Sequence, residues 1–231
     1  MSARASLRLA LVAACAVATG TAYAAAAGGA LGQGQEAGTS GEPRASAATV
    51  AAVKVDRHVR LGKRLVVRGR LTPAEGGRKV RLRARIGRRW RTVDRTLSGR
   101  GGRFRTVWRP GRAGVFRLRV VAPNSGVPNA SASRTRSRRA FVYRPAAASW
   151  YGPGFYGNRT GCGGRLGYNQ LGVAHKWLPC GTRVRFRYRG RSVTVPVIDR
   201  GPYAGNREWD LTAATKRRLG FPSTGIVWST R

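Results

Sequence analysis

The feature that most constrains the fold is a repeated alternation of basic and apolar residues. Runs such as KVRLRARI (79–86) and GVFRLRVVA (114–122) recur between residues 50 and 144, separated by breaks rich in Gly and Pro. A period of two is the pattern of a β-strand with one buried face, and breaks about every 8–12 residues are typical of a sandwich of two sheets. The sequence therefore predicts an all-β fold, with a β-sandwich over residues 50–144.

The charge is extreme but evenly spread. The chain carries 45 Lys and Arg against 8 Asp and Glu, a formal net charge of +37. Such a chain attracts polyanions, yet its arginines alternate with apolar residues, as on the solvated face of a strand. The sequence contains no signature of a helix-turn-helix, a zinc finger or an RNA-binding sheet. We therefore expect anionic surroundings and no specific nucleic-acid partner, and we place Trp90 and Trp108 in the core.

The first residues have the pattern of a secretion signal. Arg4 and Arg8 precede an apolar run that ends near Ala18, and a small-x-small cleavage site ends at Ala24. Residues 1–24 are therefore predicted to be a signal peptide, and the mature protein to be exported. Two alternatives stay open: a lipoprotein signal that anchors the protein to the membrane through Cys15, and a short transmembrane helix. Residues 25–49 lack periodicity and are predicted to be a disordered linker.

Cys162 and Cys180 are the remaining pair of thiols. In an oxidising compartment, two cysteines in this arrangement are most simply a disulfide, and a bridged sulfur cannot act as a nucleophile. Apart from these thiols, the exported chain has only His58 and His175, in different regions and without metal-ligand spacing. No metal site and no cofactor are expected.

The stretch from Arg191 to Leu211 concentrates acids in an arginine-rich chain. An alternating apolar run leads to Asp199, and Asp210 follows close to a helix-like segment. Two carboxyl groups in one cleft can supply the protonated acid that glycosidic-bond cleavage requires. A structural interpretation stays open, because Asp-Arg-Gly-Pro also suits a turn and Asp210 also suits a helix N-cap.

Local patterns predict the elements around these acids. Residues 182–189 and 191–198 alternate and are predicted to form a hairpin that turns at Arg189-Gly190. A helix follows, capped by Asp210 or Thr212 and stopped by Gly220, and residues 225–229 form a last strand. A strand is also predicted at 140–143, followed by a hinge at residues 145–148.

Several ordered motifs in the last third resemble one family. They are Ser149-Trp150-Tyr151-Gly152, Gly157 with Thr160, Ala174-His175-Lys176 with Leu178-Pro179, Gly181-Thr182-Arg183-Val184, Asp199-Arg200-Gly201-Pro202 and Asp210-Leu211. At this order and spacing they are similar to rare lipoprotein A (RlpA)-like double-psi β-barrel proteins, which are related to expansin-like and barwin-like proteins. The resemblance implies a six-stranded barrel with one short helix over residues 145–231. More loosely, residues 50–144 resemble bacterial immunoglobulin-like modules.

The resemblance implies a function and site residues. In RlpA-like enzymes the positions of Asp199 and His175 are implicated in cleaving peptidoglycan strands without water, which leaves a 1,6-anhydro end, and in expansin-like relatives the position of Asp210 lies in the glycan groove. The expected partner is peptidoglycan or another anionic wall polymer, and the protein is expected to act as a monomer at the cell wall. The candidate substrate-binding residues are Tyr151, Tyr156, Trp177, Arg200, Tyr203 and Trp209.

One departure from the family pattern favours an alternative function. Family members commonly carry an Asn-Gly-Glu-x-x-Asp segment before the Ala-His-Lys motif, but Gly164 and Gly167 occupy the Glu and Asp positions here. A site without that Glu suits an expansin-like protein that binds and loosens glycan without cleaving it. The sequence thus leaves a lytic transglycosylase as the leading hypothesis and a non-catalytic glycan-binding protein as the alternative. Export and the absence of a nucleic-acid motif argue against a third, a polyanion-binding protein that acts through its charge alone.

Overall fold

The computed structural model describes residues 47–124, 127 and 130–231. The predicted signal peptide, Cys15 and most of the predicted linker lie outside these residues. Ala48, which the sequence assigns to the linker, is buried in the core of the first domain. No helix within the described part of the chain is long and apolar enough to cross a membrane.

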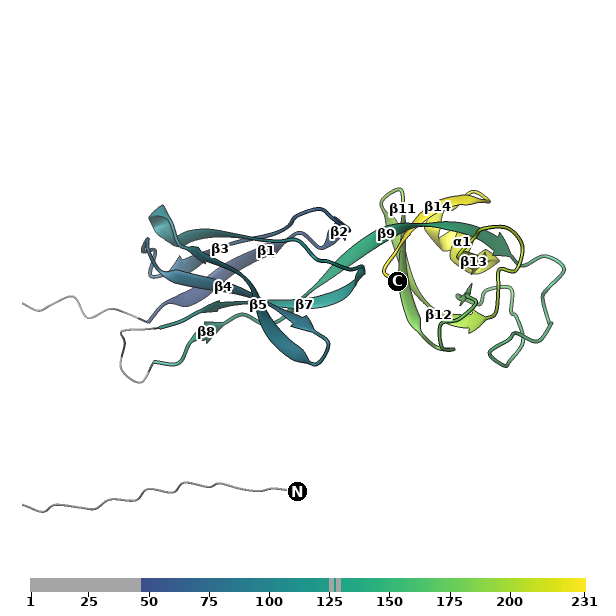
Figure 1. Cartoon of the computed structure of the whole chain (residues 1–231), viewed down its shortest axis with the longest axis horizontal. Helices are drawn as coiled ribbons and strands as arrows, with labels where there is room; N and C mark the ends of the chain where they lie inside the picture. Colours follow the sequence, from purple (N-terminus) through teal and green to yellow (C-terminus); the bar gives the residue numbers. More distant parts are fainter. Residues whose placement is uncertain (1–46, 125–126, 128–129) are drawn as a thin grey trace, which may run out of the picture. The chain divides into compact units, whose positions relative to one another are not determined.

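Two sheets form the N-terminal part (Figure 1). The first has the order β1-β3-β6 and consists of β1 (Thr49–Val55), β3 (Leu65–Thr72) and β6 (Arg103–Trp108), with a short 3-10 turn, η1 (Arg100–Gly102), before β6. The second has the order β5-β4-β7-β9 and consists of β4 (Lys79–Ile86), β5 (Arg89–Leu97), β7 (Gly114–Ala122) and the first part of β9 (Arg138–Tyr151). Two short strands complete it: β2 (His58–Arg60) lies parallel to β9, and β8 (Ser133–Arg134) pairs with β7. Two sheets around one core confirm the predicted β-sandwich, and its immunoglobulin-like character stays a prediction.

The alternating pattern explains the core of the sandwich. Apolar residues of one parity, such as Leu65, Val67 and Leu82, are fully buried, while the arginines between them are mostly exposed. Trp108 packs against this core and contacts Phe116 edge to face, as predicted. The core assignment of Trp90 is wrong, because this partly exposed ring lies under the guanidinium group of Arg119 outside the core cluster.

Strand β9 runs through both folding units without a break. Ala140 and Val142 lie in the core of the sandwich, whereas Ala146 and Ala148 lie in a second core. The predicted hinge at residues 145–148 is therefore wrong. Pro145 lies where β9 changes partners, from β7 up to residue 142 to β14 from residue 144 onwards. Proline has a φ angle that an extended strand accepts, so the residue that suggested a break fits within the strand.

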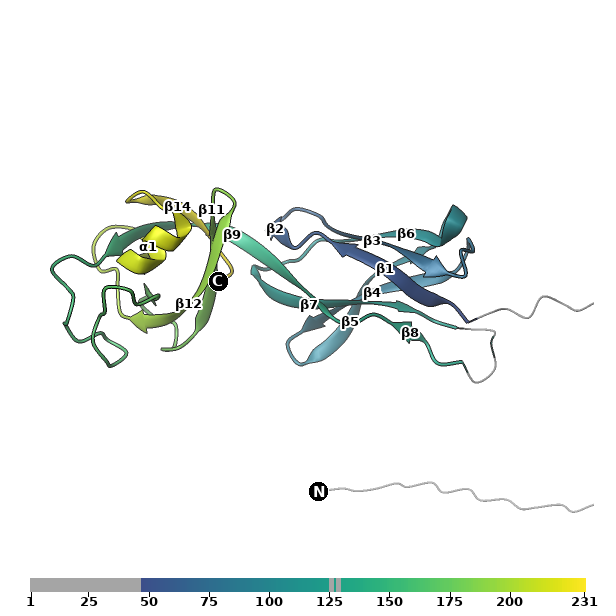
Figure 2. The ribbon, with the colours of Figure 1, turned by 180° about the vertical axis from the view of Figure 1, so that it is seen from behind.

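The C-terminal part is a closed barrel of six strands (Figure 2). The strands are β9, β10 (Val173–Ala174), β11 (Arg183–Tyr188), β12 (Arg191–Asp199), β13 (Trp209–Thr212) and β14 (Gly225–Ser229). They pair in the order β9-β13-β10-β12-β11-β14, and the pairing of β14 with β9 closes the circle. Two pairs, β10 with β12 and β13 with β9, are parallel. The all-β fold and the six-stranded double-psi barrel with one helix are thus confirmed.

The turn and helix predictions for this part also hold. Arg189 and Gly190 both have positive φ angles, 40° and 85°, at the tip of the β11–β12 hairpin, as a two-residue hairpin turn requires. Helix α1 (Ala213–Leu219) is capped by the side chain of Thr212, which accepts a hydrogen bond from the Thr215 N–H, and ends at a left-handed Gly220. Asp210 is not the cap, because it lies inside β13.

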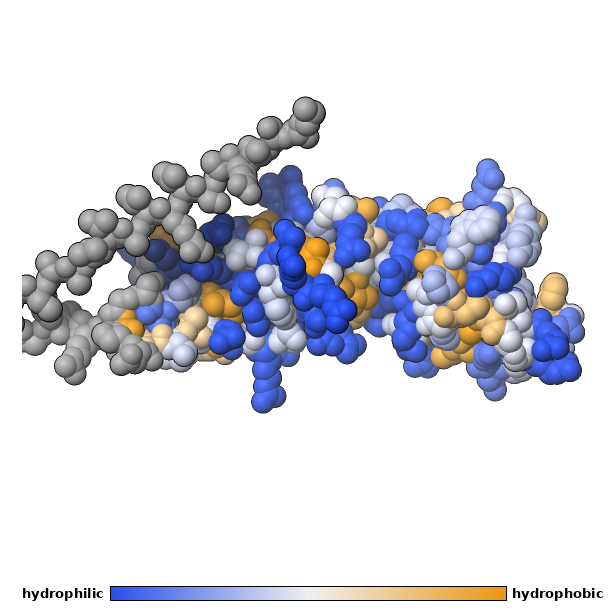
Figure 3. Space-filling model, turned by 60° about the horizontal axis from the view of Figure 1, so that its bottom comes forward, coloured by the Kyte–Doolittle hydropathy of each residue, from blue (hydrophilic) through white to orange (hydrophobic). Residues whose placement is uncertain are grey.

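Hydrophilic side chains cover most of the face in Figure 3, and hydrophobic ones form small separate groups on it. The large exposed apolar side chains of the barrel include Phe155, Tyr168, Trp177 and Tyr203.

Candidate functional site

Four neighbouring strands of the barrel bring the two candidate acids onto one row. Ala174 of β10 pairs with Asp199 of β12 on one side and with Asp210 of β13 on the other, and Ser149 of β9 pairs with Asp210. Adjacent strands lie about 4.8 Å apart, so the Cα atoms of the two acids are separated by about 10 Å. The methyl group of Ala174 leaves open space between the two carboxyl groups.

An irregularity in β12 turns Asp199 toward that space. Val193, Val195 and Val197 point into the barrel core, and strict alternation would send Asp199 there too. The register shifts between the pairs Val173–Val197 and Ala174–Asp199: from one pair to the next, β12 moves on by two residues while β10 moves on by one. Such a bulge re-aims the side chains that follow it, and Asp199 thereby joins the face that carries Asp210.

Backbone groups hold the carboxylate of Asp199 in position. Its Oδ1 accepts hydrogen bonds from the N–H of Gly161 at 2.6 Å and from the N–H of Arg200 at 2.8 Å. A side chain at Gly161 would meet the stem of Arg200, since an added Cβ would lie 2.7 Å from its Cγ. The absence of a side chain at residue 161 is therefore what lets this loop approach Asp199.

Asp210 is the carboxyl group with the perturbed proton affinity. Burial raises its pKa above the ordinary value of 3.8, and the negative charge of Asp199 adds to the increase. The hydroxyl of Ser149 donates to its Oδ1 at 2.7 Å, and this bond and the charge of Arg207 act in the opposite direction. A protonated carboxyl group can donate a proton to a substrate, and the raised pKa makes Asp210 better able to hold such a proton than an ordinary aspartate.

Tyr151 lies close to both acids. Its hydroxyl is buried and forms no hydrogen bond of good geometry among the described residues. Burial, the charge of Asp199, an interaction with its carboxylate, and the charge of Asp210 together raise the pKa of Tyr151. The hydroxyl therefore stays protonated and is available as a donor to Asp199 or to a bound ligand.

These groups line a cavity of about 200 Å³. Of the residues singled out in the sequence, Tyr151, Asp199, Arg200, Tyr203 and Asp210 lie on its wall. Sequence reasoning missed Ser149 as a partner of Asp210 and missed Phe155, Ala174 and Arg207 in the lining. The position of Arg207 in the site could have been anticipated from the sequence, because Arg207 lies three residues before Asp210. Within the described part of the chain, no three His, Cys, Asp or Glu side chains gather where they could hold a metal ion.

His175 faces away from this cavity. Its Nδ1 accepts hydrogen bonds from the N–H groups of Trp177 and Leu178, both at 3.0 Å, so the ring proton lies on Nε2. Nε2 is 3.9 Å from Glu208, which is paired with Arg144, and the ring contacts the ring of Trp209 at a tilt of 48°. Burial lowers the pKa of His175 despite the charge of Glu208. The neutral ring therefore orients the loop after β10.

The other predicted binding residues occupy different positions. The assignment of Trp209 to sugar binding is wrong, because its ring is fully buried in the barrel core; it alternates with Asp210 along β13 and so points inward. Tyr156 contacts Tyr168 outside the cavity lining. Trp177 is 84% exposed but does not line the cavity, whereas Tyr203 is 78% exposed and does.

A disulfide and the side chain of Arg200 fix the loop that follows β10 near the site. Cys162 and Cys180 form the predicted disulfide. Arg200 donates to the carbonyl oxygens of Leu178 at 2.9 Å and His175 at 3.3 Å, so its guanidinium group is committed to the loop while its stem borders the cavity. Gly164 has a left-handed φ of 77°, where a glutamate would be strained, and it is not part of the cavity lining.

Comparisons with known proteins match the barrel. Residues 145–228 match the family described as lytic transglycolase. The probable endolytic peptidoglycan transglycosylase RlpA of Synechocystis is 49% identical over 81 residues, which are 34% of this chain and 25% of the relative. The corresponding protein of Neisseria meningitidis serogroup A is 45% identical (35% of this chain, 34% of the relative), and that of Aquifex aeolicus 42% (35% and 36%). The chain thus spans only about a quarter to a third of the length of these relatives. Over residues 145–228, the resemblance to RlpA-like double-psi β-barrel proteins is confirmed.

Proposed function

We propose that the protein is exported and cleaves the glycan strands of peptidoglycan as a lytic transglycosylase. The observation that carries this proposal is the placement of Asp199 and Asp210 on one cavity wall, with burial raising the pKa of Asp210. The names of the relatives, which are endolytic peptidoglycan transglycosylases, support it.

The two acids have complementary roles in this reaction. Asp210 donates its proton to the glycosidic oxygen as the bond between that oxygen and C1 of the muramoyl sugar breaks. The 6-hydroxyl oxygen of the same sugar forms the new bond to C1, and Asp199 accepts the hydroxyl proton. One bond forms for each that breaks, no water is consumed, and the product carries a 1,6-anhydro end. The raised pKa of Asp210 supports Asp210, rather than Asp199, as the donor.

Neighbouring residues bind and orient the substrate. The hydroxyl of Tyr151 donates to Asp199 or to a sugar hydroxyl, and the exposed rings of Tyr203 and Phe155 offer apolar faces to the sugar at the cavity wall. His175 acts as a positioning residue, since it holds the backbone of the loop from Trp177 to Leu178.

Digestion of isolated sacculi by the full chain tests the proposal. We expect mass spectrometry to detect 1,6-anhydro-muropeptides that contain no ¹⁸O when the digestion is run in ¹⁸O-labelled water, because water does not enter the product. Asp199→Asn and Asp210→Asn should each abolish the product while the barrel stays folded, and Asp56→Asn in the sandwich serves as the control. Labelled reducing ends would identify a hydrolase instead.

A non-catalytic glycan-binding function is the second candidate. Gly164 at the usual Glu position and the disulfide-stapled loop favour it. Under this alternative the protein would bind sacculi and loosen them without generating new chain ends of either kind. Digestion at increasing protein concentration, with sacculus binding measured in parallel, distinguishes the two candidates.

Attachment and assembly complete the proposal. We place the exported protein at the cell wall as a monomer, with membrane attachment only if Cys15 is lipidated. The intact mass of protein purified from its native compartment separates cleavage at Ala24 from lipidation at Cys15, and light scattering measures the assembly state.

A further inference from the structure

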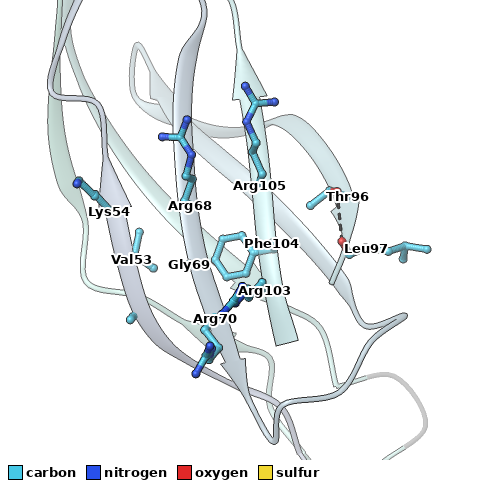
Figure 4. Close-up of a pocket in the computed structure, with 11 residues that line it drawn as sticks. Val53, Lys54, Arg68, Gly69, Arg70, Thr96, Leu97, Arg103, Phe104 and Arg105 are labelled. Carbon is cyan, nitrogen blue, oxygen red and sulfur yellow. Dashed lines mark hydrogen bonds between the residues drawn. The ribbon is translucent and has the colours of Figure 1, made fainter. Parts of the chain in front are cut away.

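A basic cavity lies on the sandwich, well away in sequence from the acids of the barrel. It has a volume of about 760 Å³ and lies on the sheet β1-β3-β6, with the end of β5 at its border. Each of the three strands contributes basic side chains to its lining. They are Lys54, Arg68, Arg70, Arg103 and Arg105, and all of them are exposed (Figure 4).

The strand register places these cations directly opposite one another. Arg68 of β3 pairs with Lys54 of β1 and with Arg105 of β6, and Arg70 pairs with Arg103. Figure 4 shows the guanidinium groups of Arg68 and Arg105 extending in the same direction from neighbouring strands. Like charges directly opposite each other on adjacent strands destabilise a sheet. The free protein therefore carries an unfavourable arrangement at this surface.

Almost nothing in the described residues offsets this repulsion. Arg68 lies 4.0 Å from Asp56, a long and exposed ion pair. None of the other four cations donates a hydrogen bond or forms an ion pair to a described residue. On the second sheet, Arg83 donates to the carbonyl oxygen of Trp90 and Arg119 covers the Trp90 ring, while Arg81 and Arg95 also lie opposite each other. The cations of the cavity thus have few partners among the described residues and can bind an external anion.

The floor of the cavity indicates which kind of anion fits. Gly69 forms its middle, and the ring of Phe104 packs against Gly69 from the core side of the sheet, so closely that a Cβ at Gly69 would lie 2.4 Å from the ring. Phe104 is only 5% exposed, so the surface offers no aromatic face on which a nucleobase could stack. The one strongly exposed apolar side chain at the border is Leu97, which gives a membrane little to bury. A polyanion without bases or acyl chains matches this lining.

We propose that this cavity binds a linear phosphodiester polymer without bases, of the teichoic-acid type. The rows Lys54–Arg68–Arg105 and Arg70–Arg103 lie two residues apart along the strands, about 7 Å, so successive phosphates of one chain can contact both rows. One guanidinium group can donate two parallel hydrogen bonds to two oxygens of a phosphate, and four of the five cations are arginines. The choice of a wall polymer rests on the proposed function, whereas the binding itself is independent of glycan cleavage.

The test measures binding of the full chain to soluble poly(glycerol phosphate) over a range of salt concentrations. Arg68→Gln with Arg105→Gln should weaken binding at least tenfold and reduce the slope of log affinity against log salt by about 1.5, because two phosphate contacts are lost. The control, Arg89→Gln with Arg91→Gln on β5, removes the same charge from positions opposite Ile86 and Ala84, and should change neither quantity.

A thermal unfolding series separates a binding role from a structural one. Without polymer, the Arg68/Arg105 double variant should unfold at a higher temperature than the unmodified protein, because the opposed charges are gone. With polymer, the unmodified protein and the control should gain more stability by ligand binding than the Arg68/Arg105 double variant. A lower unfolding temperature without polymer, or equal loss of binding in both double variants, overturns the proposal. Tighter binding to single-stranded oligonucleotides of equal charge, or to anionic lipid vesicles, overturns the assigned ligand. Failure of sacculus digestion alone would affect only the proposed function.

Discussion

Removing the disulfide should weaken the barrel by an amount that the structure sets. Cys162 and Cys180 are separated by 18 positions and close a loop that reaches the candidate site. A crosslink of this span lowers the entropy of the unfolded chain by an amount worth about 3 kcal/mol at room temperature. We therefore expect Cys162→Ala with Cys180→Ala to lower the free energy of unfolding of the barrel by about 3 kcal/mol.

Hydrogen exchange measured by mass spectrometry reports on the barrel alone. Peptides from β11 and β12 should lose protection by about 150-fold in the double variant, which is the free-energy change expressed as an equilibrium ratio. Peptides from β3 and β4 in the sandwich serve as the internal control and should keep their protection. Cys15→Ser in all variants removes the third thiol.

A second treatment checks the reasoning. Reduction of the unmodified protein should reproduce the loss of protection, and the same reductant should leave the double variant unchanged. A decrease of less than tenfold in the protection of β11 and β12 would refute the loop-entropy argument. It would mean that the hydrogen bonds of Arg200 to the carbonyl oxygens of Leu178 and His175 hold the loop without the covalent bond.

Three further predictions concern the site and its supports. Because folding raises the pKa of Asp210, this carboxyl group favours the folded state only while it is protonated; the contribution is complete below the ordinary pKa of 3.8 and is lost as the pH rises. At neutral pH, Asp210→Asn should therefore unfold at a higher temperature than the unmodified protein, and the difference should disappear in acid. The opposite order of unfolding temperatures would contradict the burial argument. Gly164→Glu should lower the free energy of unfolding, measured by chemical denaturation, by about 1–2 kcal/mol, because residue 164 has a left-handed φ of 77° that a side chain disfavours. No loss of stability would show that the loop relaxes. His175→Asn keeps an acceptor for the N–H groups of Trp177 and Leu178 and should retain more sacculus digestion than His175→Ala; equal losses with an intact fold would assign the ring a direct part in the reaction.

Most elements of the fold could be predicted from the sequence because most strands have one solvent-exposed face and one buried face. The alternation of arginine with Val, Leu and Phe located β4, β7 and β11, the alternating valines located β12, and Thr212 and Gly220 marked the ends of α1. The wrong prediction of a hinge at Pro145 has a physical reason. A proline signals a break only where its missing N–H or its fixed φ is incompatible with the structure, and sequence alone does not show that a strand changes partners at this residue.

The site was readable only in part. Asp199 and Asp210 came from motifs, but the bulge in β12 that turns Asp199 away from the core depends on pairing with β10, a strand of two residues without a clear pattern of its own. The burial of Trp209 could have been anticipated, since Trp209 and Leu211 share one parity and Asp210 the other. The direction of His175 could not, because it depends on N–H groups in the following loop.

The continuity of β9 has a mechanical consequence. The strand pairs with β7 through Val142 and continues to Ser149 and Tyr151, which flank the two acids. An extended chain already spans about 3.3 Å per residue and has almost no slack, so tension applied to the sandwich is carried along one taut covalent segment of about 30 Å to the cavity wall. If a wall polymer held by the sandwich is stretched, β9 therefore carries the load toward the hydrogen bond between Ser149 and Asp210, and the pairing of residues 144–148 with β14 shares that load.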